Sequence, residues 1–188
     1  MSYITQKKIA ASFKSLMLEM PLTKISVTTI MTHAAIRRQT FYEYFPDKYA
    51  LLAWIYDQEV GEYVDDNLSY THWTLILEQL FQYFDDNRQF YQNALSIEGQ
   101  NSFESHLLQH VRQLVNTIIK NMITNQGITL SANYQKFLLN YLSGALVTYT
   151  TGWLQERQPG SVEQVTTALK MTLTDTLNGL LLRTGHLQ

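Results

Sequence analysis

The sequence of 188 residues contains no cysteine, only three prolines, and no apolar run of the roughly 18 residues that cross a membrane. Without cysteine the chain forms no disulfide framework and offers no thiol chemistry. The first residues, MSYITQKKIAASF, are polar where a signal peptide needs an unbroken apolar segment, so we expect no export. These absences predict a cytoplasmic protein with no membrane partner.

The sequence also lacks the arrangements that are typical of enzymes. It has no glycine-rich phosphate loop, no Gly-x-Ser-x-Gly and no pair of acidic residues in a catalytic context. Hydrophobic residues make up 45% of the chain and charged residues 16%, which favours a globular core over disorder. The length fits one or two small domains. We therefore expect a folded protein that is not an enzyme and needs no cofactor.

The charge is unevenly distributed along the chain. Residues 1–50 contain seven Lys and Arg against three Asp and Glu, a net charge of +4, whereas the whole chain carries −2. The remaining residues therefore carry −6. This asymmetry is typical of a small DNA-binding domain joined to an acidic effector domain.

Residues 24–48 predict two short helices separated by a tight turn. Ser26 precedes an apolar-periodic run, and its hydroxyl can accept a hydrogen bond from the free N–H groups of a first turn, so a helix is expected to begin at Val27. The small residues of Ala34–Ile36 suit a close corner between two helices. A second apolar set begins there at once, which predicts that the second helix follows directly.

The second helix is expected to continue to Phe45, with Phe41 and Phe45 one turn apart on its inner face. Pro46 ends this helix, and Asp47 can cap the next one. Its outer surface carries polar and amphipathic side chains: Arg37, Arg38, Gln39, Thr40, Tyr42 and Tyr44. This arrangement is typical of a helix-turn-helix that reads nucleic acid.

Four stretches of this segment resemble the DNA-binding signature of TetR-family transcriptional regulators: Ile25–Ile30, Ala34–Ile36, Thr40–Phe45 and Lys48. The resemblance implies a three-helix DNA-binding domain over residues 1–47 and an effector-binding and dimerisation domain over residues 48–188. It also implies a homodimer on an inverted-repeat operator. The chain departs from the family at Ala35, where glycine is usual and where a side chain in a left-handed conformation costs roughly 1–2 kcal/mol.

Helix-turn-helix docking directs the N-terminal residues of the second helix at base edges. Arg bonds guanine and Gln bonds adenine in the major groove, which favours base or phosphate contacts over solvated surface for the residues that begin this helix. The resemblance implies that Thr28, Lys48 and the two tyrosines contact phosphates, with partial burial as an alternative for Tyr44. The predicted DNA-binding set is Thr28, Arg37, Arg38, Gln39, Thr40, Tyr42, Tyr44 and Lys48.

The form IRRQTFYEYF, followed by Leu51–Ile55, is most similar to the branch of dihydroxyacetone kinase operon regulators. The resemblance implies that the effector signal in such a branch can come through a protein partner. We therefore expect control by a small-molecule or protein effector acting on the C-terminal domain. The competing interpretation is a helical protein-interaction adaptor or co-regulator whose N-terminal domain has little specific DNA binding of its own.

Apolar residues recur at threes and fours along the rest of the chain, and no strand-like alternation persists. The pattern predicts an all-α protein of about nine helices. We expect further helices over residues 4–20, 48–67, 73–83, 103–125 and 132–156, a short helix capped at Asp86, and a last helix after Ser161. The helix after Trp73 is expected to bury Leu75, Ile76, Leu80 and Phe84.

The two long C-terminal helices carry more apolar surface than a small domain covers alone. The resemblance implies that they form a four-helix bundle with the same pair of a second subunit, and the alternative is that both belong to a monomer core. The predicted dimer interface is Tyr141, Ala145, Tyr149, Leu169, Leu173, Leu177 and Leu180.

Two further patterns leave alternatives open. His106 and His110 lie one helical turn apart, which would let two imidazoles share a metal, but no third ligand is evident beyond Glu104, Glu98 or His72, so we favour ordinary helix-flank histidines. Amphipathic aromatics of the C-terminal part suit a ligand cavity and an ordinary core equally well, so no pocket residues are assigned: Tyr63, Tyr70, Trp73, Tyr83, Tyr91, Tyr134, Tyr141, Tyr149 and Trp153.

Overall fold

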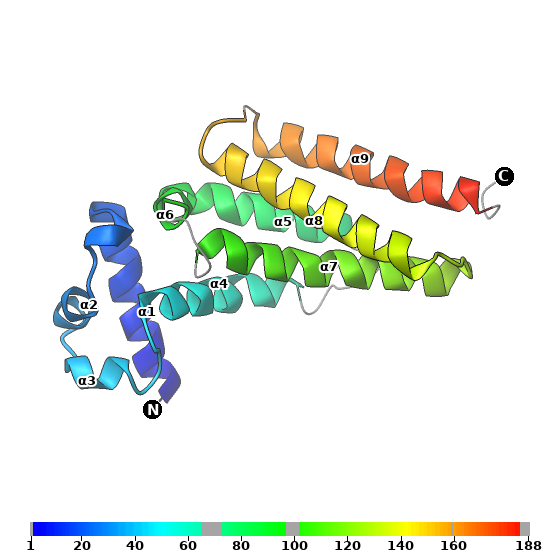
Figure 1. Cartoon of the computed structure of the whole chain (residues 1–188). Helices are drawn as coiled ribbons and strands as arrows, with labels where there is room; N and C mark the ends of the chain where they lie inside the picture. Colours follow the sequence, from blue (N-terminus) through cyan, green and yellow to red (C-terminus); the bar gives the residue numbers. More distant parts are fainter. Residues whose placement is uncertain (1, 65–72, 97–101, 159, 185–188) are drawn as a thin grey trace. The chain divides into compact units, whose positions relative to one another are not determined.

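The structure, a computed structural model, describes residues 2–64, 73–96, 102–158 and 160–184. These residues form nine α-helices, one short 3-10 helix and no strand, which confirms the all-α prediction (Figure 1). None of the described helices is both long and apolar enough to span a membrane. The chain divides into two compact units, residues 1–61 with 87–106 and residues 62–86 with 107–188.

The first unit contains the predicted helix-turn-helix. Its elements are α1 (Ser2–Glu19), η1 (Leu22–Lys24), α2 (Val27–His33), α3 (Arg38–Phe41), most of α4 (Lys48–Val64) and α6 (Arg88–Ala94). α1 contacts both α2 and α6, and α2 contacts α3. The buried residues of α1–α3 form one small core, and they include Ile9, Phe13, Met17, Ile30 and Phe41. α1, η1, α2 and α3 are called the head from here on.

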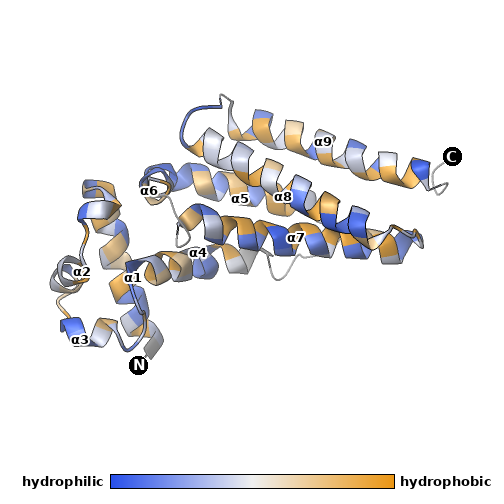
Figure 2. Ribbon diagram, in the orientation of Figure 1, coloured by the Kyte–Doolittle hydropathy of each residue, from blue (hydrophilic) through white to orange (hydrophobic). Residues whose placement is uncertain are grey.

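The second unit is built from four longer helices, namely α5 (Trp73–Asp86), most of α7 (Phe103–Gln126), α8 (Ala132–Leu154) and α9 (Val162–Arg183). α5 packs against α9, where Lys170 forms an ion pair with Glu78. Hydrophobic and hydrophilic residues alternate along α8 and α9 in Figure 2, as expected for helices that bury one face. Leu138, Leu142 and Trp153 are buried on α8.

Local sequence signals account for several helix ends. Gly127 has a φ of +63° and follows the end of α7, where a left-handed residue closes a helix. Ser131 caps α8 by accepting from the Tyr134 N–H. At the start of α9, Ser161 and Gln164 form a capping box in which each side chain accepts from the other residue's backbone N–H. These ends confirm the predicted boundaries.

Two local predictions were wrong. Asp86 does not cap α6: it is the last residue of α5 and accepts from Gln82 Nε2 at 2.8 Å, and the N-cap is Asn87, whose side chain makes no cap bond. Leu75 is 51% exposed, because neighbouring residues on a helix point about 100° apart and the adjacent Ile76 takes the buried position.

A third difference is the length of the second helix of the helix-turn-helix. α3 covers only Arg38–Phe41, and residues 42–45 continue as hydrogen-bonded turns, with Phe45 N donating to Phe41 O at 2.9 Å. Pro46 disfavours helical geometry at Phe45, so the chain does not continue as a helix beyond these turns. The expected end of α4 at residues 65–67 and the expected breaks at residues 67–72 and 97–101 lie outside the described residues.

Candidate nucleic-acid interface

The turn between α2 and α3 has a left-handed residue at Ala35, with a φ of +53°. Ala35 N donates to Thr32 O at 3.1 Å and Ile36 N donates to Met31 O at 3.0 Å. These are the two hydrogen bonds of a Schellman motif, which satisfies the last carbonyls of a helix only if the residue after its C-cap is left-handed. The turn therefore keeps the geometry that glycine usually provides, at the cost of a Cβ in an unfavourable region.

The N-terminus of α2 is capped as predicted. Ser26 Oγ accepts from the Thr29 N–H at 3.0 Å, and the two hydroxyls lie 2.8 Å apart. Ser12 Oγ, buried on α1, donates to Ile30 O at 2.8 Å and lies 2.9 Å from His33 Nδ1. These bonds join the middle of α1 to the last turn of α2, and so they orient the helix that precedes the turn.

The residues that begin α3 face solvent. Arg37 is the N-cap of α3, with an extended backbone and no cap bond from its side chain. Arg37 and Gln39 are exposed, and neither side chain has a hydrogen bond or an ion pair with any residue that the structure describes. Arg38 Nη2 donates to the Tyr42 hydroxyl at 3.2 Å, with its guanidinium 5.9 Å from the centre of the Tyr42 ring. The outer surface of α3 thus presents two cations, an amide and a phenol.

The inner face of α3 is fixed by aromatic packing. Phe41 and Phe45 are fully or almost fully buried, and their ring centres are 5.6 Å apart. Thr40 and Tyr44 are half-buried, and the Tyr44 ring lies 6.4 Å from that of Phe45. Tyr44 is therefore partly in the core, which was the alternative considered for it.

Lys48 has partners inside the protein. Its Nζ donates to Leu22 O at 2.7 Å and to Ile25 O at 2.8 Å, and burial lowers the pKa of its ammonium group. The side chain therefore joins the first turn of α4 to the first residue of η1 and to the residue that follows η1. Two of its three N–H groups are used in this way, and its predicted contact with phosphate stays a prediction. Thr28, also in the predicted set, is exposed on the first turn of α2.

The structure adds a residue that sequence reasoning missed. Asn93 of α6 donates through Nδ2 to Met17 O and Met20 O, both at 2.8 Å, and accepts through Oδ1 from the Leu22 N–H at 2.7 Å. Gln89 Nε2 donates to Leu18 O at 2.9 Å. α6 thus satisfies the free carbonyls at the end of α1, and it bonds to the head more than 70 residues away in sequence. No local pattern reveals such partners.

The histidine pair does not form a recognisable metal site in the described residues. His106 Nε2 lies 2.8 Å from Asp57 Oδ1, and its ring packs against Tyr56 with centres 5.7 Å apart. No group of three or more His, Cys, Asp or Glu residues gathers within the part of the chain that the structure describes. His72 and Glu98 lie outside that part, so the metal hypothesis stays untested.

The predicted dimer residues differ widely in exposure. Tyr141 is 63% exposed and Ala145 is exposed, whereas Leu177 and Leu180 are buried within their own unit. The other predicted residues, Tyr149, Leu169 and Leu173, are half-buried. The structure also shows a stack that sequence reasoning missed, in which Phe137 lies between Tyr134 and Tyr141 with ring centres 6.2 and 5.8 Å apart. Phe137 is 58% exposed.

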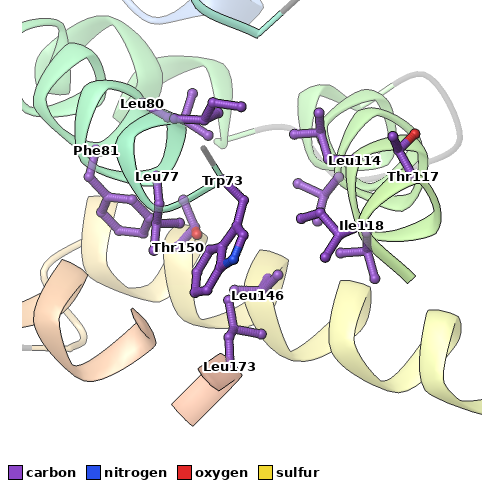
Figure 3. A pocket seen from close by; sticks show the side chains of 13 residues that line it. Trp73, Leu77, Leu80, Phe81, Leu114, Thr117, Ile118, Leu146, Thr150 and Leu173 are labelled. Carbon is purple, nitrogen blue, oxygen red and sulfur yellow. The ribbon is translucent and has the colours of Figure 1, made fainter. Parts of the chain in front are cut away.

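The second unit contains a partly open cavity of about 70 Å³ lined by residues of α5, α7, α8 and α9 (Figure 3). Trp73 is the one residue of its wall that was among the candidate aromatics. The rest of the wall is mainly aliphatic, for example Leu77, Ile118 and Leu146. Periodicity could not have assigned these residues, because a cavity wall and a filled core produce the same apolar spacing.

The head therefore has the form of a helix-turn-helix whose second helix presents cationic and amide side chains, and it defines a class of DNA-binding regulators. Residues 71–175 match the TetR-type family described as "Transcriptional regulator C-terminal region". The chain is 36% identical over 149 residues, 79% of each protein, to the HTH-type dhaKLM operon transcriptional activator DhaS of Lactococcus lactis.

Two further matches agree with these. The chain is 26% identical over 147 residues, 72% of its length and 75% of the relative's, to the transposon Tn10 TetC protein of Escherichia coli. A solved structure of a dihydroxyacetone kinase operon activator, DhaS, superposes with a TM-score of 0.75 at 31% identity, covering 95% of this chain and 98% of that one. The chain belongs to the TetR family of transcriptional regulators. It is a DNA-binding regulator and not an enzyme, and its resemblance to the dihydroxyacetone kinase operon branch is confirmed.

Proposed function

We propose that the protein acts as a homodimer that binds an inverted-repeat operator, with α3 of each subunit in the major groove of one half-site. The observation that carries this proposal is the exposed start of α3, where Arg37 and Gln39 have no partner in the described residues and Arg38 is paired only with Tyr42. Such groups are free to exchange water for base edges on docking.

The proposed roles follow from the position of each side chain in the head. The base edges are contacted by Arg37, Arg38 and Gln39. Thr40 follows them on the same helix and belongs to the same proposed interface. Thr28, at the start of α2, and the Tyr42 hydroxyl bind phosphates, as does Tyr44 where its hydroxyl reaches the surface. Lys48 holds η1 in place through the carbonyls of Leu22 and Ile25 and offers its remaining N–H to a phosphate.

Dimerisation is proposed through α8 and α9, and the exposed aromatic residues of α8 support it. Phe137 and Tyr141 are each more than half exposed, and Met171 of α9 is 62% exposed. Large apolar side chains in such numbers favour burial against a second copy. We propose Tyr141, Ala145, Tyr149 and Leu169 as interface residues. Leu177 and Leu180 are buried, so we propose that they pack α9 against its own unit and hold the interface residues of this helix in place.

Control by an effector is proposed to act on residues 48–188, with residues 1–47 as the DNA-binding domain and the cytoplasm as the site of action. The cavity of the second unit is the proposed effector site. Regulation requires that the effector bind the DNA-competent and the DNA-incompetent state with different affinity. A protein partner acting on the same domain is the alternative source of the signal.

The test of this function is binding of the purified full-length protein to the DNA upstream of its own gene, titrated across salt, with a scrambled duplex as control. We expect tight binding, a preference for the native duplex and a steep loss of affinity with salt. Equal, weak binding to both duplexes, with or without cell extract, would instead support an adaptor whose head does not read DNA.

A matched pair of variants sharpens this test. Arg38→Ala is expected to weaken operator binding by roughly 5- to 150-fold, the range for one good base contact, without changing the thermal midpoint. Arg112→Ala, an exposed arginine of α7, is the control and should bind as the wild type does. Equal affinities of the two variants would refute the assigned role of Arg38.

The dimer is tested in the same way by sedimentation. Tyr141→Arg is expected to dissociate the dimer, whereas Leu75→Arg, at an exposed leucine of α5, should leave it intact. A dimer that tolerates both changes would place the interface elsewhere.

A further inference from the structure

The wall of the cavity in the second unit carries no charge. Apart from two threonines and the indole of Trp73, every lining side chain is a hydrocarbon, from Leu77 on α5 to Leu173 on α9 (Figure 3). An ion or a polyol that entered would lose its water without gaining partners, which is strongly unfavourable. The wall therefore selects against charged and polyhydroxylated ligands.

One polar group of the wall is available to a ligand. The Thr117 hydroxyl donates to Gln113 O at 3.0 Å and is thus already used within α7. Thr150 of α8 is only 6% exposed, yet its hydroxyl has no hydrogen bond to any residue that the structure describes. Thr150 lines the cavity, so a ligand with one hydrogen-bonding atom that reaches its hydroxyl would form a hydrogen bond there.

A smaller cavity of about 40 Å³ continues this space. The two cavities share five lining residues: Trp73, Val115, Ile118, Leu146 and Leu173. Its other lining residues are all aliphatic, and they include Leu142 of α8. A ligand too long for the first cavity can therefore extend an apolar tail into the second.

We propose that this pair of cavities binds a small uncharged molecule that is apolar over nearly its whole surface and has one hydrogen-bonding group directed at Thr150. This inference rests on the proposed function in so far as the same site is the effector site. It deepens that function by naming the ligand class: an aliphatic alcohol or a compound of similar shape, in contrast to a sugar, a polyol or an organic acid.

The test uses the full-length protein and the straight-chain 1-alkanols from 1-butanol to 1-octanol, with glycerol and hexanoate as the polyol and the anion. Binding is followed by tryptophan fluorescence, to which Trp73 contributes from the wall, and by the shift in thermal midpoint. We expect the affinity to rise roughly fourfold per methylene until the cavities are filled. Glycerol and hexanoate are expected not to bind at the same concentrations.

Variants test separately the two features of the wall that should determine binding, namely the Thr150 hydroxyl and the apolar volume of the cavity. Thr150→Val keeps the shape and removes the hydroxyl, and it is expected to weaken 1-hexanol binding roughly fivefold while leaving hexane binding unchanged. Leu77→Phe fills the cavity and should abolish binding of the longer alkanols. Leu75→Phe, two residues away on the exposed face of α5, is its control and should bind as the wild type does.

The inference is overturned if no alkanol binds, if affinity does not depend on chain length, or if glycerol or hexanoate binds better than 1-hexanol. Operator binding measured with and without 1-octanol separates this from the proposed function. Alkanol binding with an unchanged operator affinity would leave the ligand class standing and remove the effector role. Intact operator binding without any alkanol binding would leave the proposed function standing and remove the ligand class.

Discussion

Asn93 allows a quantitative test of how the head is stabilised. Replacing it with Ala removes three hydrogen bonds, those to Met17 O and Met20 O and that from the Leu22 N–H. Each is worth about 1 kcal/mol, and Leu22 is fully buried, so its N–H has no route to water. Ala gains about 0.6 kcal/mol over Asn in helix propensity. We therefore expect Asn93→Ala to lower the free energy of unfolding by about 2–3 kcal/mol.

The assay is urea unfolding at fixed protein concentration, combined with hydrogen exchange of the Leu22 amide, which should lose its protection in the variant. Asn93→Asp keeps an acceptor for the Leu22 N–H but places a carboxylate against two carbonyls, so at neutral pH it should be at least as unstable as Asn93→Ala. Asn125→Ala, at an exposed asparagine near the end of α7, is the control. A change within 0.5 kcal/mol of that control, with Leu22 still protected, would refute the reasoning.

Three other predictions concern positions whose local geometry is defined. Ala35→Gly should raise the free energy of unfolding by about 1 kcal/mol, because the φ of Ala35 is +53°. Ala34→Gly should lower it by a similar amount, because Ala34 has a right-handed conformation. Urea titrations that show a change of the same sign for both variants would contradict this. Ser161→Ala should cost about 1 kcal/mol through loss of the capping box, and a thermal midpoint equal to that of the wild type would exclude it. Burial lowers the pKa of Lys48 below 10.5, so as pH rises toward that value the unfolded state keeps more protons on Lys48 than the folded state does, and the contribution of Lys48 to stability should increase. The difference in free energy of unfolding between the wild type and Lys48→Met should therefore grow from about pH 8 to about pH 10. A difference that shrinks over this range would contradict the argument.

The helix boundaries of this protein were predictable where a single residue decides the local geometry. Ser26, Ser131 and Ser161 each cap the helix that follows, and Gly127 is left-handed after α7. A cap depends on contacts within three or four residues, so the sequence contains all the information needed. The same holds for the turn at Ala35, which was expected from its position between two apolar-periodic segments.

Predictions failed where two local choices had nearly equal weight. Asp86 and Asn87 are both good cap residues; Asp86 ends α5 and accepts from Gln82 one turn earlier, and Asn87 is the N-cap of α6. Leu75 and Ile76 are both apolar, and only the packing of α5 within its unit decides that Ile76 is buried. For Leu75 and Ile76, tertiary contacts selected one of two acceptable local solutions, whereas the bond to Asp86 lies within α5.

The candidate site divides along the same line. The sequence alone determined the helix-turn-helix, the cationic and amide side chains at the start of α3 and the burial of Phe41, because these depend on short spacings and on which residues are apolar. It did not determine the carbonyl partners of Lys48 or the three bonds of Asn93, which join groups 23 to 76 residues apart.

Only the tertiary structure decided that the second unit contains a cavity and that Thr150 lies on its wall. A cavity forms where side chains from several helices fail to fill the space between them, and its volume depends on helix positions to within a fraction of a residue's size. The apolar pattern of α5, α7, α8 and α9 specifies which faces turn inward. Whether those faces meet closely is a property of the packed helices, and no single segment of the sequence contains it.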